Sequence, residues 1–113
     1  MDSILTSIKK LLGIAEDYEH FDFDIIAHIN SVFVILNQLG VGPSEGFFIT
    51  DKYAVWDDYI SDDPIISTVK TYMGLKVKIL FDPPDRSTVI DATTRAISEL
   101  EWRLLIQAEK PIE

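Results

Sequence analysis

The residues of this sequence that could do chemistry are two histidines, several serines and a run of aspartates. His20 lies in an acidic stretch, and His28 lies at the edge of an apolar stripe. Neither histidine is spaced with a second residue that would complete a base–nucleophile pair or a pair of metal ligands. The serines lack the glycine pattern of a nucleophile elbow. We therefore expect no catalytic residues and no enzyme activity.

The densest acidic run superficially resembles a calcium site. Its aspartates stand at positions 57, 58, 62 and 63. A calcium-binding loop needs oxygen ligands at alternate positions, then a glycine and a distant glutamate, and the run lacks that order. Asp63 followed by Pro64 instead fits a helix cap with proline at the first helical position. We expect capping here and no bound metal.

A loop rich in glycine and proline follows position 39, and its glycines could in principle cradle a phosphate. Residues 40–46 read GVGPSEG, without the lysine and serine or threonine that a phosphate-binding loop requires. The three-glycine spacing of a dinucleotide-binding turn is also missing. We expect no nucleotide and no other cofactor.

The charge of the chain argues against binding to nucleic acid. Among its 113 residues, 19 are acidic and 10 are lysine or arginine, which gives a net charge of −9. The basic residues are scattered, so no sequence patch would neutralise a row of phosphates. An acidic surface could still let DNA slide past without sticking. Acidity that serves only solubility remains the alternative.

Composition and hydropathy indicate a globular, cytoplasmic protein. Hydrophobic residues make up 47% of the chain and charged residues 26%, which is too apolar for a disordered chain. The longest uncharged run, 25–44, is amphipathic, so we expect no membrane span. Lysines follow the first apolar residues and do not precede them, which is the wrong order for a secretory signal. The absence of cysteine excludes disulfides and fits a reducing compartment.

Apolar spacing predicts an all-α fold, a small helical bundle with about four helices. We expect one domain over residues 1–113, in which 108–113 could form a flexible tail. The expected helices span residues 4–12, 25–39, 65–81 and 86–109, with a shorter helix near 51–60. The candidate N-terminal caps are Asp2 or Ser3, Asp22 or Asp24, Thr50-Asp51, Asp63, and Asp85 or Ser87. Gly13 and Gly40 are the expected C-terminal caps of the first two helices.

Residues 75–81 fit both a helix and a strand, because Lys76 and Lys78 alternate with apolar residues. A strand here would need a partner, and no other segment alternates convincingly. Residues 65–81 are also long and well capped, and Gly74 inside a helix costs only about 1 kcal/mol relative to alanine. We predict a helix.

The last helix carries two apolar faces and follows a rigid corner. Phe81, Pro83 and Pro84 surround that corner, because each proline disfavours helix in the residue before it. The predicted core face consists of Val89, Ile90, Ile97, Leu100 and Leu104. The opposite face carries Trp102 and Ile106 with Arg95 beside them, and Glu99 can pair with Arg103. We predict that the corner residues and the residues of this opposite face form a protein interface. Its members are Phe81, Pro83, Pro84, Arg95, Glu99, Trp102, Arg103 and Ile106.

Two further points concern apolar side chains that could meet a partner. Trp102 could instead lie under a loop of its own chain, because tryptophan is usually buried. Val34 points away from the core stripe of the second helix, formed by Ile25, Ile29, Val32, Leu36 and Leu39. It could meet another element or another subunit.

Several short motifs resemble those of the head-to-tail connector, or adaptor, proteins of long-tailed bacteriophages. They occur in the same order along most of the chain: Ile29-Asn30-Ser31, Leu39-Gly40-Val41-Gly42-Pro43, Gly46-Phe47, Trp56, Phe81-Asp82-Pro83-Pro84 and Glu99-Leu100-Glu101-Trp102-Arg103-Leu104. None is a catalytic signature.

The resemblance implies a small helical structural protein of the virion, assembled in the host cytoplasm at the head-to-tail interface. About twelve copies would form a ring beneath the portal protein by matching its symmetry. The ring would extend the DNA channel without specific DNA binding, and would present a surface to a stopper or tail-completion protein. The alternative is a generic helical protein–protein interaction module without a phage role.

Overall fold

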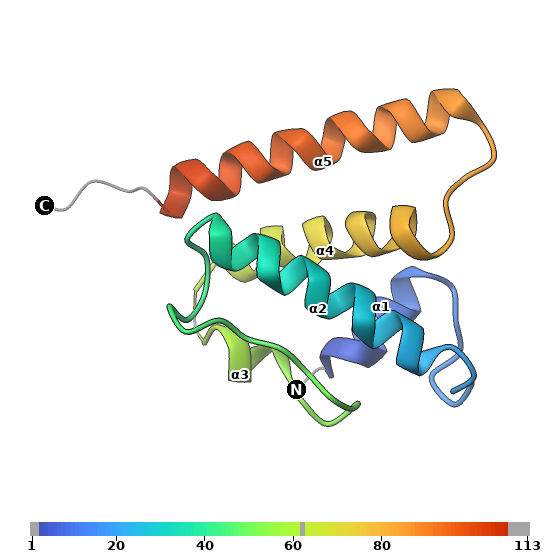
Figure 1. The fold of residues 1–113 in the computed structure, drawn as a ribbon, viewed down its shortest axis with the longest axis horizontal. Coiled ribbons are helices and arrows are strands. Elements are labelled where there is room, and N and C mark those ends of the chain that lie inside the picture. The colour runs from blue at the N-terminus through green and yellow to red at the C-terminus, as the bar shows by residue number, and fades with distance from the viewer. Residues whose placement is uncertain (1–2, 62, 109–113) are drawn as a thin grey trace, which may run out of the picture.

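The computed structural model describes residues 3–61 and 63–108, and this part of the chain is mostly helical, without a β-strand (Figure 1). Its helices are α1 (Ile4–Leu11), α2 (Asp22–Gln38), α3 (Trp56–Tyr59), α4 (Ile65–Phe81) and α5 (Ser87–Ala108). The all-α prediction is therefore confirmed, with four long helices and one single turn. Part of the expected tail, 109–113, lies outside the described residues, whereas Ala108 is the last residue of α5.

Helix α1 begins and ends where the sequence predicts. The Ser3 side chain accepts a hydrogen bond from the Thr6 amide at 3.2 Å, which satisfies one unpaired amide of the first turn. Gly13 follows the C-cap with a φ of 78°, a left-handed conformation that favours glycine. The other candidate cap, Asp2, lies outside the described residues.

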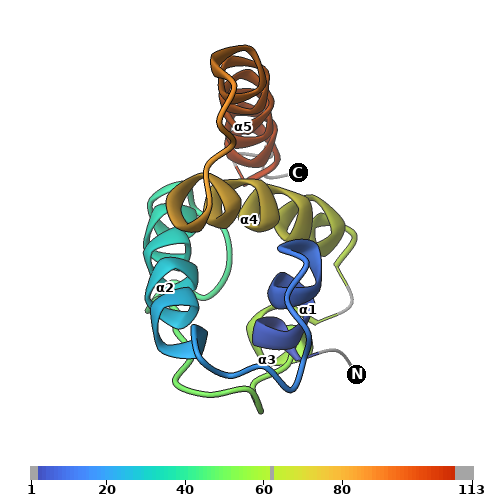
Figure 2. The same ribbon diagram turned by 90° about the vertical axis from the view of Figure 1, so that its right-hand side faces the viewer.

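The core lies between α1, α2 and α4, which surround it in Figure 2. Helix α2 supplies the predicted stripe: Ile25, Ile29, Val32 and Leu36 are fully buried, and Leu39 packs against them from just beyond the helix. Val34 is 58% exposed on the other side, as its position on the helix predicts. Burial of this stripe is what holds α2 against its neighbours.

The predicted cap of α2 is wrong. Its N-cap is Phe21, which makes no side-chain cap, and neither Asp22 nor Asp24 takes that role. Asp22 instead faces Lys9 of α1, with 2.8 Å between Oδ1 and Nζ. A buried ammonium requires a charge partner, and this requirement outweighs the local capping preference of an aspartate.

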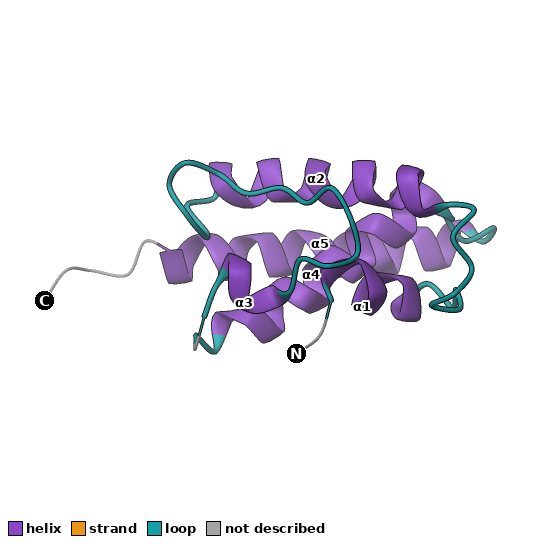
Figure 3. Cartoon of the chain, turned by 90° about the horizontal axis from the view of Figure 1, so that it is seen from below, coloured by secondary structure: helices purple, strands orange, loops and turns teal. Residues whose placement is uncertain are grey.

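A long loop, 40–55, runs alongside α2 and is fastened to it by two side chains, Asn30 and Asn37 (Figure 3). The Asn30 amide donates to the Ile49 carbonyl at 2.9 Å, and its oxygen accepts from the Ile49 amide at 2.8 Å. Two hydrogen bonds to one loop residue replace the partners that a strand would supply.

The predicted cap of the short helix is also wrong. Helix α3 begins at Trp56, after the N-cap Val55, and not beside Thr50-Asp51. Asp58 accepts from the Val55 amide at 3.0 Å and so holds the start of the single turn. The Asp51 side chain instead accepts from the amide of Tyr53, two residues later, at 2.9 Å. This hydrogen bond forms an Asx-turn.

Helix α4 confirms the helical interpretation of residues 75–81. The predicted cap is displaced by one residue: the N-cap of α4 is Pro64, and Asp63 stands before it, where its side chain accepts from the Ile65 amide at 3.0 Å. A Cβ at Gly74 would lie 2.6 Å from Leu11 Cδ1. The glycine therefore allows α1 to approach α4 closely.

Helix α5 returns along α4 and stands as a ridge above the three core helices (Figure 2). Ile97 and Leu104 are its buried residues, and Leu100 packs against the core from a partly buried position. The first part of the helix is more exposed than we predict from its apolar spacing, and Val89 is 44% exposed. Apolar spacing thus identified the buried side of α5 but not how far along the helix burial extends.

Candidate protein-interaction site

The outward face of α5 gathers five of the predicted interface residues. Arg95, Glu99, Trp102, Arg103 and Ile106 are all exposed, and they repeat at intervals of three and four along one side of the helix. Trp102 is 61% exposed and Ile106 is 48% exposed. No loop of the described chain covers Trp102, so the alternative of burial under such a loop is wrong.

An ion pair between Glu99 and Arg103 lies on this face. Arg103 donates from Nη2 to Glu99 Oε2 at 2.7 Å and from Nε to the same oxygen at 2.9 Å. An exposed pair of this kind is worth only about 0.2 to 0.5 kcal/mol on an isolated helix. The pair therefore adds little stability, and both of its side chains remain exposed on this face.

The inward side of α5 is fixed by a buried polar contact with α4. The hydroxyl of Tyr72, which is fully buried, donates to Glu101 Oε2 at 2.7 Å, and Lys76 Nζ lies 3.9 Å from the same oxygen. Burial, and then the hydrogen bond and charge of Glu101, raise the pKa of Tyr72 above its ordinary value. The tyrosine therefore remains a hydrogen-bond donor at neutral pH, and the rotation of α5 that presents Trp102 outward is set.

The corner residues lie at the other end of α5 from Trp102. Fifteen helical residues separate Ser87 from Trp102, which corresponds to about 22 Å of helix. Phe81 packs edge to face on Phe21, with ring centroids 5.3 Å apart, so its ring anchors the corner to the start of α2. Pro83 is exposed and Pro84 is partly buried. The structure therefore separates the predicted interface residues into an α5 group and a corner group.

The described residues offer no arrangement for metal chemistry. They contain no group of three or more histidine, cysteine, aspartate or glutamate residues that could hold a metal ion. His28 lies near the Phe81 ring, with centroids 6.3 Å apart, and His20 lies 4.7 Å from the Phe21 ring. His28 is partly buried, as expected for a residue at the edge of the core, and His20 is exposed in the acidic connector.

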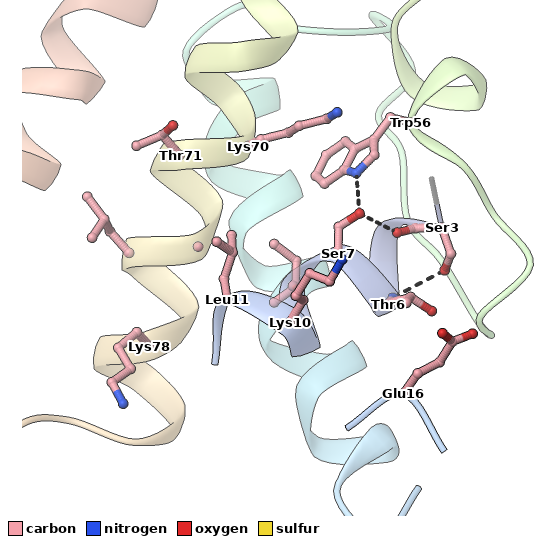
Figure 4. Close-up of a pocket in the computed structure, with 13 residues that line it drawn as sticks. Ser3, Thr6, Ser7, Lys10, Leu11, Glu16, Trp56, Lys70, Thr71 and Lys78 are labelled. Atoms are coloured by element: carbon pink, nitrogen blue, oxygen red, sulfur yellow. Dashed lines mark hydrogen bonds between the residues drawn. The ribbon is translucent and has the colours of Figure 1, made fainter. Parts of the chain in front are cut away.

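A groove between α1 and α4 is the feature that our sequence analysis missed. It has a volume of about 790 Å³ and is shown in Figure 4. Leu11, Gly74 and Leu75 provide apolar lining, and Lys10, Lys70 and Lys78 provide positive charge. The lysines seemed scattered because they come from two helices. One signal was present in the sequence: residues 70, 74 and 78 repeat every fourth position and share one helix face.

The end of the groove near α3 is built around Trp56. Its indole Nε1 donates to Ser7 Oγ at 3.2 Å, and Lys70 Nζ lies 5.6 Å from the ring centroid (Figure 4). The indole is 4% exposed, so its contribution is to fix this end of the groove. The family motif that contains Trp56 is therefore structural.

The sequence of this chain was compared with models of known protein families. A family model described as phage connector protein matches residues 4–111, nearly the whole chain. The chain belongs to the phage connector protein family. No curated protein and no solved structure matches it.

Membership of the connector family has consequences for the site. Connectors are structural components of the phage particle, and an exposed apolar face on such a component is most simply a contact with another virion protein. The matched range includes both the α5 face and the α1–α4 groove, so both belong to the connector part of the chain. In the described residues, no helix is long and apolar enough to cross a membrane.

Proposed function

We propose that this protein is a head-to-tail connector that forms a ring beneath the portal, extends the DNA channel and joins the head to the stopper or tail. The observation that carries this proposal is the family match over residues 4–111. About twelve copies would assemble, because a ring on the portal takes the portal's symmetry. The protein acts without catalysis or a cofactor, as one domain assembled in the host cytoplasm and retained in the virion.

The exposed face of α5 is the surface that docks on the portal. Trp102 offers a large apolar ring, and the Glu99–Arg103 pair beside it offers directed polar contacts. Tryptophan and arginine are enriched among the residues that dominate binding energy, especially where a partner excludes water from them. Helix α5 stands above the rest of the described chain in Figure 2, and the residues of this face are exposed from Arg95 to Ile106.

The net charge of −9 supports passage of DNA without specific binding. We assign some of the acidic side chains to the channel wall, where like charge repels the phosphate backbone. A map of the assembled ring with only neutral or basic side chains along the channel would contradict this assignment.

The test is the absolute mass by light scattering after size exclusion, for the chain alone and mixed with the portal ring of the same phage. We expect co-elution at about one copy per portal subunit, as matched symmetry requires. Trp102→Ala should remove co-elution and leave the helical circular dichroism unchanged, because the side chain lies outside the core. Tyr53→Ala is the matched control, since Tyr53 is 75% exposed far from α5 in the sequence.

Each outcome decides the proposal. Retained co-elution of the Trp102 variant would remove α5 from the portal contact, and loss of helicity would show that Trp102 is needed for folding. If the unmodified chain stays apart from the portal, the portal is not its partner, and a generic interaction module becomes the better account.

A further inference from the structure

Helix α2 presents an exposed stripe that contributes nothing to the core. The stripe consists of Phe23, Ala27, Ser31, Val34 and Gln38, at spacings of four, four, three and four. Phe23 is 84% exposed and Val34 is 58% exposed, among the largest values for apolar side chains in the described chain. The middle of the stripe has small side chains, so this side of α2 is a smooth ridge.

The stripe and the groove lie on opposite sides of the molecule. In Figure 4 the groove faces the viewer and the cyan ribbon of α2 lies behind it. The buried side of α2 faces the core, with Ile29 and Val32 fully buried, so the stripe faces away from the groove. A ring of identical subunits needs this arrangement, because each copy must present two different surfaces to its neighbours.

Charge also makes the two surfaces complementary. Helix α2 contains no lysine or arginine, and its exposed Asp24 stands beside Phe23 at the start of the stripe, whereas Asp22 is paired with Lys9 of the same chain. The groove carries Lys10 and Lys70 against one acidic residue, Glu16, whereas its third lysine, Lys78, is paired with Asp82 at 2.9 Å. A basic groove is unusual on a chain with a net charge of −9. The partner that it fits is an acidic or neutral helix, and complementary charge of this kind fixes the register of an interface.

The shape of the α1–α4 groove also fits the exposed stripe of α2. The groove is lined with the side chains of Leu11 and Leu75, and Leu11 is 59% exposed. Gly74 adds no side chain of its own, so Leu11 packs directly over α4 and forms the floor of the groove there. An amphipathic helix binds such a groove through apolar residues spaced three and four apart, which is the spacing of the stripe.

We propose that the α1–α4 groove binds the exposed stripe of α2 from a second copy of this chain, and that this head-to-tail contact joins neighbouring subunits. The inference deepens the proposed connector function and rests on it for the closed ring. It leaves the α5 face free for the portal.

Thiol cross-linking tests the contact directly, because the natural chain contains no cysteine. Val34→Cys puts a thiol on the stripe, and Thr71→Cys puts one on the exposed side of α4 in the groove. A short bis-maleimide should convert the double variant into a ladder of covalent multimers, since each copy carries both ends of the contact. Each single variant should give at most a dimer. Val34→Cys with Glu45→Cys is the matched control, because Glu45 lies in the exposed part of the 40–55 loop.

The reaction is carried out on the chain alone at high concentration and on the chain mixed with the portal ring. A ladder specific to the double variant in either sample supports the contact. Absence of the ladder from both samples overturns it, as does a groove thiol that cross-links to the portal instead of to another copy. Co-elution with the portal is scored separately, so co-elution without the ladder rejects this contact alone, and a ladder without co-elution rejects the portal assignment alone.

A charge test examines the same contact in variants without cysteine. Lys10→Glu with Lys70→Glu reverses two charges of the groove, and Val34→Lys adds a positive charge to the stripe. Each change should weaken association between copies at least tenfold by sedimentation. Mixing the two variants should restore an association, because one intact stripe then meets one intact groove. Undiminished association of either variant, or no restoration on mixing, would contradict the contact.

Discussion

Lys9 shows how a single charged side chain can organise a segment that the sequence leaves undefined. It is 2% exposed, and its ammonium donates to the carbonyls of Glu16 at 3.0 Å and Tyr18 at 2.7 Å. Asp22 Oδ1 lies 2.8 Å away without hydrogen-bond geometry, so that contact is one of charge attraction. One lysine thereby fastens the acidic connector between α1 and α2.

We predict that Lys9→Met lowers the free energy of unfolding by about 2 to 4 kcal/mol, because two carbonyls and a carboxylate lose their partner. The full cost of breaking a buried pair is not reached, since the Asp22 side chain is 20% exposed. Urea unfolding followed by circular dichroism measures the change. Lys10→Met is the control and should shift stability by less than about 0.5 kcal/mol, because Lys10 is exposed. Equal stability of the two variants would show that Lys9 is not an anchor.

At the scale of elements, the 40–55 loop is held against α3 as well as α2. Gly42 has a φ of 88°, and a Cβ there would lie 2.6 Å from Tyr59 Cε1. The Tyr59 hydroxyl lies 3.4 Å from the Val41 carbonyl, and its ring packs on Phe33 with centroids 4.7 Å apart. The loop can approach this ring because position 42 lacks a side chain.

Alanine substitutions at Gly13 and Gly42 distinguish two causes of lost stability. One is the left-handed backbone conformation, and the other is a steric clash of the new Cβ. Gly13 has a φ of 78° and nothing within 4 Å of its Cβ position. Gly13→Ala should cost about 1 to 2 kcal/mol, the cost of the left-handed conformation alone. Gly42→Ala should cost at least about 1 kcal/mol more, because the Tyr59 ring is buried in the core and cannot move aside freely. Thermal unfolding of both variants measures the difference, and equal losses would contradict a close approach of the loop to α3.

At the scale of the whole molecule, charge and shape divide the surface into regions with different tasks. The net charge of −9 is spread over the chain, whereas the groove collects three of its ten basic residues. The α5 face is mixed in charge and apolar at its centre. Such a division suits the proposed role, in which a subunit would meet copies of itself, a different protein and passing DNA.

We predict that the isolated chain does not retard linear duplex DNA at near-physiological salt, because its net repulsion outweighs the three lysines of the groove. Salt-dependent binding to nucleic acid requires several phosphate contacts made at once. A gel-shift or polarisation assay over a range of salt concentrations measures this. The groove variant Lys10→Glu with Lys70→Glu should behave identically. Binding that weakens steeply with salt and disappears in that variant would instead make the groove a phosphate site.

The sequence by itself determined the helical class, the approximate bounds of the long helices and the position of Trp102 opposite the core face of its helix. These follow from apolar spacing, glycine and proline positions, and the geometry of a single helix, all of which are local. It also indicated that the Asp63 side chain would bond near the start of α4, because such hydrogen bonds act within three residues. The family resemblance came from the order of short motifs, and the family match confirms it.

Only the tertiary structure decided which charged residues meet. Asp22 was expected to cap α2 but faces Lys9, and the groove lysines come from helices about sixty residues apart in the sequence. It also decided that Val89 stays exposed and that Gly74 marks a close helix approach. The physical reason is the same in each case: burial and charge pairing depend on neighbours brought together by folding, and no periodicity within one segment contains that information.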